Sequence, residues 1–200
     1  MTEFEKNFRK MCKNIPLLPS ILPKQERIVA IGDLHGDFDN TIKLLQIAKV
    51  IEKSKKQKYG WRWSGGNTIV VQLGDQIDNL RNNPDYDEPS DIKILKFMTD
   101  LHNQAQKEKK GGAVYSLLGN HEIMNTKGDL RYVSKANIDN DGGEKKRRLL
   151  FEPGNKIANF LGCTRKMILK IGNNIFVHGG IIPQVALKYK GDKGIKKINQ

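Results

Sequence analysis

Short apolar runs alternate along the chain with longer segments in which apolar residues recur every three or four positions. The first pattern is typical of strands buried in a sheet, and the second is typical of helices that pack one face against a core. The expected strands cover residues 28–31, 68–73, 113–118, 167–171 and 174–177. Strands and helices that alternate in this way predict an α/β domain with helices outside the sheet.

The expected helices combine the apolar spacing with residues that start or stop a helix. Asp37 or Asp39 can cap one helix, Ser90 can cap the next, and Gly111-Gly112 stops it. Helices are therefore expected in residues 1–14, from the Asp37–Asp39 cap to Ile51, from Ser90 to Gly111, and in residues 155–161, where Gly162 ends the last one.

The remaining segments lack a clear apolar period. Residues 53–66 and 79–89 are expected to form loops, the first of them with strand-like alternation around two tryptophans. Gly172-Asn173 predicts a hairpin between the last two strands. Residues 125–152 are polar and without periodicity, which predicts an irregular insertion.

Polar residues gather directly after four of the expected strands. In α/β sheets, ligands bind beyond the carboxyl ends of the strands. Three of the four histidines of the chain fall in these clusters, whereas His102 is expected at the surface or core edge of a helix. The clusters are Gly32-Asp33-Leu34-His35-Gly36, Gly74-Asp75-Gln76-Ile77-Asp78-Asn79, Gly119-Asn120-His121-Glu122 and His178-Gly179-Gly180.

The cluster residues match the needs of two neighbouring divalent ions. Such a pair needs one bridging carboxylate, for which Asp75 is the natural candidate, and further nitrogen and oxygen ligands for each ion. Asp33 and His35 would hold one ion, and Asn120 and His178 the other. Carboxylate, imidazole and amide ligands without thiolate favour Mn, Fe or Zn. The ions would polarise a phosphoryl oxygen and activate a bridging hydroxide for in-line attack.

A phosphoester that is attacked in this way also needs a proton for its leaving oxygen. His121 stands beside Asn120, and Asp78 from the neighbouring loop can orient its ring, so His121 is the predicted proton donor. The role of Glu122 is left open between a hydrogen bond to a neighbouring ligand and a structural role at its turn.

The four clusters, taken together and in this order, resemble the motifs of the calcineurin-like metallophosphoesterases. More narrowly they resemble the phosphoprotein phosphatase group, and within it Leu117–Glu122, Phe151–Gly154 and Phe176–Gly180 are most similar to the Shewanella-like branch. The resemblance implies a four-layer α-β-β-α sandwich with its metal site at the strand carboxyl ends. It also implies the same ligands and the same proton donor and partner.

The chain departs from the family pattern at three places. Leu118 stands where the usual eukaryotic members have a second phosphate-binding arginine, as in the Shewanella-like branch. Asn79 occupies the position of a phosphate-binding arginine, so Arg81 and Asn120 are the residues expected to contact the substrate phosphate. The last metal-binding histidine of the family would lie after the end of this chain at Gln200. We therefore expect residues 1–200 to form a single domain, incomplete at its C-terminus and with residues 1–26 as an N-terminal extension.

The function expected from the motifs is a metal-dependent phosphomonoesterase, namely a protein phosphatase acting on phosphoserine, phosphothreonine or phosphotyrosine. Hydrolysis of a nucleotide or dinucleoside polyphosphate is one alternative, and a non-catalytic relative that lacks the last histidine is another. The expected partner is a phosphorylated protein or a small phosphoester. The oligomeric state and the physiological substrate stay open.

Composition adds limits to this picture. The net charge of +13 comes from lysines scattered along the chain without interleaved aromatic residues, so a nucleic-acid partner is not expected. No apolar run approaches the ~20 residues of a membrane span, and no secretory signal precedes the first strand. Cys12 and Cys163 are far apart, which predicts two reduced thiols in an intracellular, cytoplasmic protein.

Overall fold

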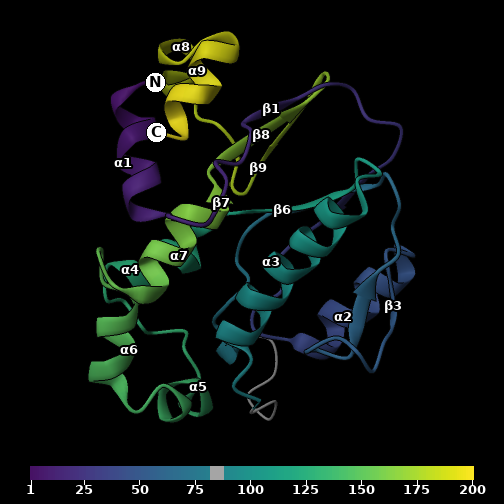
Figure 1. Ribbon diagram of the computed structural model, residues 1–200. Coiled ribbons are helices and arrows are strands. Elements are labelled where there is room, and N and C mark those ends of the chain that lie inside the picture. Colours follow the sequence, from purple (N-terminus) through teal and green to yellow (C-terminus); the bar gives the residue numbers. More distant parts are fainter. Residues whose placement is uncertain (82–87) are drawn as a thin grey trace.

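Two main sheets, a two-stranded sheet and the helices around them make up the computed structural model, which describes residues 1–81 and 88–200 (Figure 1). The helices are α1 (Glu3–Met11), α2 (Phe38–Ile47), the 3-10 turn η1 (Asn79–Arg81), α3 (Asp91–Glu108), α4 (Asn120–Thr126), α5 (Lys135–Asn140), α6 (Glu144–Phe151), α7 (Lys156–Thr164), α8 (Pro183–Lys188) and α9 (Gly191–Ile198). The strands are β1 (Ile21–Leu22), β2 (Ile28–Ile31), β3 (Ile51–Lys53), β4 (Trp61–Trp63), β5 (Ile69–Gln72), β6 (Ala113–Leu117), β7 (Arg165–Lys166), β8 (Ile168–Ile171) and β9 (Asn174–Val177).

The larger sheet is parallel and has the order β2-β5-β6-β7. Ile31 of β2 lies beside Gln72 of β5, which in turn lies beside Ser116 of β6, so these three strands end at the same edge. The second sheet has the order β1-β8-β9, and Gly172-Asn173 joins β8 and β9 as an antiparallel hairpin. The expected strands and hairpin are confirmed.

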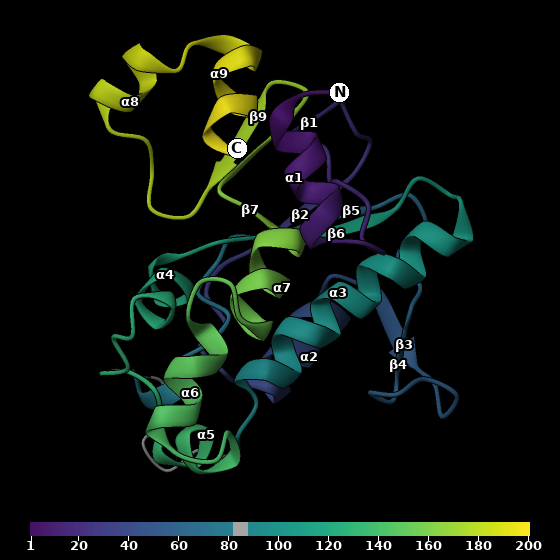
Figure 2. The ribbon, with the colours of Figure 1, turned by 60° about the vertical axis from the view of Figure 1, so that its left-hand side comes forward.

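Both faces of the larger sheet are covered. Helices α2 and α3 pack on one face around Val70, Val114 and Phe97. The other face meets the second sheet through a core that includes Val71, Leu117 and Leu169. Helix α9 contacts β8 and β1 on the outside of the second sheet (Figures 1 and 2). The expected sandwich flanked by helices is confirmed.

Residues 125–152 are more regular than their sequence predicts. They contain the end of α4 and all of α5 and α6, and these helices lie together with α7 on one side of the molecule (Figure 2). Several of their inward-facing residues are polar, among them Asn125, Asn137 and Arg147. A helix that buries polar residues has no apolar period, so the expectation of an irregular insertion was wrong.

Three helix ends differ from expectation. Lys49 adopts a φ of 54°, which stops α2 before Ile51, and Ile51 instead pairs in β3. Gly162 lies inside α7 and does not end it. Ser90 does precede α3, but its buried side chain makes no capping hydrogen bond.

The two cysteines form a disulfide between Cys12 and Cys163, with a Cα–Cα distance of 5.7 Å. Both are buried where α1, with Phe8, packs on α7. The prediction of two reduced thiols was therefore wrong. The 151 positions that separate the two residues in sequence conceal a contact that only the packing of α1 on α7 creates.

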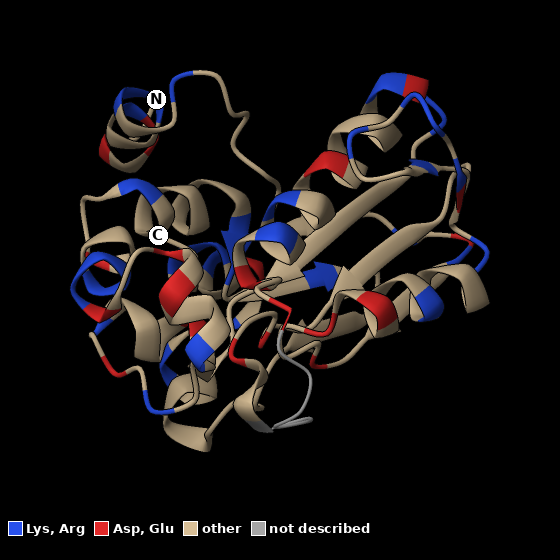
Figure 3. Ribbon diagram, turned by 90° about the horizontal axis from the view of Figure 1, so that it is seen from below, with Lys and Arg blue, Asp and Glu red and all other residues tan. Residues whose placement is uncertain are grey.

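Charged residues are spread over the molecule. In the view of Figure 3, basic and acidic segments both occur across the whole width, and several acidic segments lie near the centre. Within the described part of the chain, no helix is long and apolar enough to cross a bilayer.

Candidate metal centre

The loops that follow β2 and β5 are joined by backbone hydrogen bonds. The amides of Leu34 and His35 donate to the carbonyl of Asp75 at 2.9 and 3.0 Å, and the amide of Gly36 donates to Gln76 at 3.0 Å. His35 and Asp75 both have positive φ, at 43° and 53°. Such values are uncommon for residues with a side chain and indicate loops held in shape by their neighbours.

Glu122, in the first turn of α4, holds the loop after β5 against the loop after β6. Its carboxylate accepts hydrogen bonds from the amides of Asp75 at 2.9 Å, Gln76 at 2.7 Å and Gly119 at 2.7 Å. Burial raises the pKa of Glu122, and these amide bonds oppose the rise. Glu122 therefore acts on the backbone that carries Asp75 and Asn120 and fills the structural role left open above.

Gly74 allows the same two loops to approach each other closely. It has a φ of 100°, and a Cβ atom built on it would lie 2.6 Å from the amide nitrogen of Gly119. No side chain fits at this distance. Gly74 thus places the predicted bridging carboxylate, Asp75, next to the start of α4.

Each of the two predicted ligand histidines is oriented by a hydrogen bond to a backbone carbonyl. Nδ1 of His35 lies 3.2 Å from the carbonyl oxygen of Ile77, and Nδ1 of His178 lies 2.9 Å from that of Leu73. A carbonyl only accepts, so Nδ1 carries the proton and Nε2 presents its lone pair. This arrangement is typical of histidines that bind metals.

The five predicted ligands meet beyond the strand ends. Nε2 of His178 lies 3.0 Å from Oδ1 of Asn120 and 3.2 Å from Oδ2 of Asp75. Oδ2 of Asp33 lies 3.6 Å from Nε2 of His35, and its Oδ1 lies 3.7 Å from Nδ1 of His178. Asp33 therefore lies between the two histidines. Ligand atoms of Asp33, Asp75 and His178 all lie within 4.8 Å of one another, and so do those of His35, Asp75 and His121.

This donor set fits divalent ions. Its atoms are carboxylate and amide oxygens and imidazole nitrogens that converge from four loops, and one group, Asp33, Asp75 and His178, consists of predicted ligands alone. Asp75 belongs to both groups, which fits a bridging carboxylate, but the second group joins His35 to the predicted proton donor His121 instead of to Asp33. No cysteine takes part, because the two cysteines are bonded to each other near α1.

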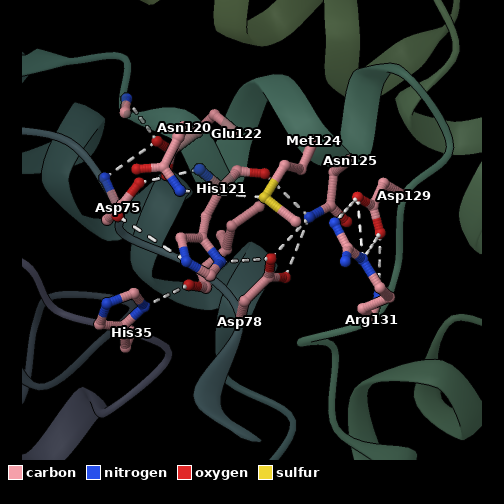
Figure 4. Close-up of polar contacts among 12 residues, drawn as sticks. His35, Asp75, Asp78, Asn120, His121, Glu122, Met124, Asn125, Asp129 and Arg131 are labelled. Carbon is pink, nitrogen blue, oxygen red and sulfur yellow. Dashed lines mark hydrogen bonds and ion pairs between the residues drawn. The ribbon is translucent and has the colours of Figure 1, made fainter. Parts of the chain in front are cut away.

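His121 has a different environment from the two predicted ligand histidines. Its Nδ1 lies 2.8 Å from Oδ2 of Asp78, a carboxylate instead of a carbonyl, and both side chains are fully buried (Figure 4). Its ring packs edge-on against His35, with centroids 4.7 Å apart, and against Tyr132 at 5.1 Å. Its Nε2 lies 3.9 Å from Asp75, so the ring lies between the predicted ligands and Asp78.

Three further residues surround Asp78, and no pattern in the sequence indicated them. Asn125 donates from Nδ2 to both oxygens of Asp78, each at 3.0 Å. Asp91 accepts from the amide of Asp78 at 3.1 Å, and Nη2 of Arg147 lies 3.6 Å from Oδ1 of Asp78. They come from α3, α4 and α6, where none of them belongs to an apolar pattern or a motif.

The residues predicted to contact substrate phosphate are described in part. Asn120 lies at the centre, beside His178. The side chain of Arg81 lies outside the described part of the structure. Asn79, at the position of the family arginine, is buried and accepts a hydrogen bond from Asn137 at 3.2 Å, so it faces α5.

Known proteins resemble this chain over most of its length. It is 29% identical over 226 residues to Shewanella-like protein phosphatase 2 of Arabidopsis thaliana, covering 92% of this chain and 52% of the relative. Shewanella-like protein phosphatase 1 of Plasmodium berghei is 29% identical over 159 residues, covering 78% and 39%. The chain thus spans about half the length, or less, of these curated relatives.

A solved structure and a family model agree with these relatives. The crystal structure of the cold-active protein tyrosine phosphatase of a psychrophilic Shewanella species is 28% identical, with a TM-score of 0.66, over 92% of this chain and 50% of that chain. The model of the calcineurin-like phosphoesterases matches residues 26–199, which include all four clusters. The resemblance seen in the motifs is confirmed, and the chain belongs to the calcineurin-like phosphoesterase family.

Proposed function

We propose that the protein is a metal-dependent phosphomonoesterase that acts on phosphorylated protein. The observation that carries the proposal is the difference among the three clustered histidines. Backbone carbonyls hold Nδ1 of His35 and His178, so that Nε2 of His35 faces Asp33 and Nε2 of His178 faces Asp75. A buried carboxylate, in contrast, holds Nδ1 of His121. Two are thus suited to bind ions and the third to handle a proton.

In this proposal Asp33, His35, Asp75, Asn120 and His178 hold two divalent ions, of which Mn, Fe and Zn suit the donors. When bound, the ions supply positive charge at the phosphoryl oxygens and a water molecule of lowered pKa. The side chains set the geometry, because the loops that carry them are already joined by backbone hydrogen bonds.

The proton for the leaving oxygen is proposed to come from Nε2 of His121. Asp78 accepts from Nδ1 and stabilises the imidazole with a second proton on Nε2, which is the form that can donate. Phosphate contacts from Asn120 and Arg81 complete the proposal. The protein-phosphatase relatives favour phosphorylated protein over nucleotides as the substrate class.

The test is turnover of metal-depleted protein after addition of Mn, with p-nitrophenyl phosphate, phosphoserine and phosphotyrosine peptides, and a nucleoside triphosphate as substrates. Asp75→Asn is expected to lower turnover at least about a thousandfold, as expected when the chemical step loses an essential group. Asp39→Asn, an exposed carboxylate on α2, is the matched control and is expected to leave turnover unchanged.

Metal content separates the two histidine roles in the same experiment. His121→Asn is expected to keep the bound ions while turnover of the phosphoserine peptide, which has a poor leaving group, falls about a hundredfold or more. Loss of the ions in that variant would make His121 a ligand. Turnover that survives both chelation and Asp75→Asn contradicts the proposal, and preference for the nucleoside triphosphate would favour the nucleotide-hydrolysing alternative.

A further inference from the structure

Arg147 of α6 is a charged side chain with no exposed surface. Its guanidinium lies within hydrogen-bond distance of three polar side chains from three different segments. Nε and Nη2 donate to Oδ1 of Asn125 at 3.0 and 2.8 Å. Nη2 also donates to Asp91 at 2.9 Å, and Nη1 donates to Asp141 at 2.9 Å. A buried arginine with so many partners fixes their positions relative to one another.

Two of these partners lead directly to Asp78. Because Arg147 occupies Oδ1 of Asn125, the amide must present Nδ2 to Asp78, and Nδ2 lies 3.0 Å from each carboxylate oxygen. The same Nδ2 donates to the carbonyl of His121 at 3.0 Å, which connects Asp78 to the turn that carries the imidazole (Figure 4).

The second connection runs through Asp91. One carboxylate oxygen of Asp91 accepts from Arg147, and the other accepts from the backbone amide of Asp78 at 3.1 Å. Asp78 has a φ of 73°, a left-handed conformation that a residue with a side chain rarely adopts without support. Arg147 therefore supports both the backbone and the side chain of Asp78 through intermediate residues.

Charge supports the same conclusion. Asp78 and Asp91 are both completely buried, and two buried carboxylates destabilise each other unless a cation is near. Arg147 is that cation, with Nη2 at 2.9 Å from Asp91 and 3.6 Å from Asp78. Without it, we expect the two acidic side chains to move apart or to admit water.

We propose that Arg147 is a positioning residue for proton transfer: it holds Asn125 and Asp91 so that Asp78 keeps the His121 ring directed at the leaving oxygen. This inference rests on the function proposed above. Arg147 itself touches no substrate, since it is buried among its partners. Its contribution is the orientation of His121, and a segment outside the four motifs supplies it.

The kinetic test uses two substrates that differ in their leaving group. p-Nitrophenyl phosphate has a good leaving group and needs little proton donation, whereas phenyl phosphate has a poor one and depends on it. Arg147→Met is expected to lower kcat for phenyl phosphate about tenfold more than for p-nitrophenyl phosphate, with KM and metal content nearly unchanged. His121→Asn should show the same selectivity, and the double variant should lose little more.

Matched variants control for a purely structural effect. Arg148→Met removes the neighbouring arginine, which is bound to Glu144 on the exposed side of α6, and is expected to leave both substrates unaffected. Arg147→Lys keeps the buried charge and should recover part of the loss. Asn125→Ser removes the direct contact with Asp78 and carries the same test if Arg147→Met does not fold.

A spectroscopic measurement makes the result independent of turnover. The Nδ1 proton of His121, shielded from solvent and bound to Asp78, should give a separate low-field NMR resonance. We expect this resonance in the wild type and in Arg148→Met, and its loss or shift in Arg147→Met and Asn125→Ser. If the wild type shows the resonance but no metal-dependent turnover, the proposed function fails while the positioning role stands.

Two results would overturn the inference. One is a folded, metal-containing Arg147→Met that lowers kcat equally for both substrates while His121→Asn is selective. The other is an unchanged His121 resonance in both Arg147→Met and Asn125→Ser. Either outcome would reduce Arg147 to a structural cation of α6.

Discussion

At the scale of single residues, the three histidines of the centre differ in the group that accepts a hydrogen bond from Nδ1. The sequence predicts which residues gather, because aspartates and histidines that follow expected strands can be identified from the sequence alone. It does not show that Ile77 and Leu73 offer carbonyls to His35 and His178 while Asp78 faces His121. Those contacts depend on loop conformations with positive φ, which the motif letters do not specify.

Lys166 of β7 offers a test of burial at this scale. It is only 7% exposed, and among the described residues no ion pair involves its ammonium group. Burial lowers its pKa from 10.5 to about 8. The folded state therefore disfavours the charged form, and the resulting loss of stability is complete below about pH 8 and disappears as pH approaches 10.5.

Lys166→Met is accordingly expected to raise the free energy of unfolding at pH 7, on the order of 2 kcal/mol. The gain should shrink as pH rises toward 10.5, because the lysine is then already neutral in the folded state and increasingly neutral in the unfolded state. Denaturant unfolding at pH 7 and pH 10 measures the difference. Lys43→Met on the exposed side of α2 is the control, expected to change stability by less than about 0.5 kcal/mol at either pH. A gain in the free energy of unfolding that does not depend on pH would contradict the conclusion that burial of the charged ammonium group destabilises the fold.

At the scale of elements, the fold was predictable where burial is apolar. The main strands and the face of α3 follow from the apolar pattern, since Ile94, Leu95, Met98, Leu101 and Ala105 are all buried. The pattern fails in α4, α5 and α6, whose inward faces carry Asn125, Asn137 and Arg147. These polar residues satisfy each other only in three dimensions, so the part of the site that supports Asp78 had no signature in the chain.

Gly74 lies where the loop after β5 meets the start of α4. Substitutions at Gly74 and at Gly111 together distinguish the effect of backbone strain from that of steric contact. Gly74→Ala places Cβ 2.6 Å from the Gly119 amide and should push the loop after β5 away from α4. Gly111 also has positive φ, at 85°, but a Cβ there meets nothing within 4 Å. Gly111→Ala should therefore lower stability by about 1 kcal/mol from conformation alone, and Gly74→Ala by at least about 2 kcal/mol more.

Chemical denaturation and metal titration of both variants measure these effects. Gly74→Ala is also expected to weaken metal binding, because Asp75 moves with the loop, while Gly111→Ala should bind metal as the wild type does. Equal losses of stability in the two variants would show that a Cβ atom at Gly74 causes no steric destabilisation.

At the scale of the whole molecule, two sheets and their helices bring four separate segments to one edge. The α/β class, the sandwich and the family were predictable from the order of strands and motifs. The disulfide was not, because it depends on α1 lying against α7. The expected absence of nucleic-acid binding, the cellular compartment and the roles of the individual ligands stay predictions.

The Cys12–Cys163 bond determines whether fragments stay joined after a peptide bond is cut. It closes residues 12–163 into a ring that contains Asp33, His35, Asp75 and Asn120, and leaves His178 on a tail outside it. A single peptide bond cut within the ring opens it without separating the molecule into pieces. Protein nicked once by trypsin inside the ring should therefore run as one species on a non-reducing gel and as two after reduction, whereas Cys12→Ser should give two in both cases. Fragments that separate without reductant would show that the ring is open, and a cut after Lys170, between Cys163 and His178, would release the histidine-bearing tail alone.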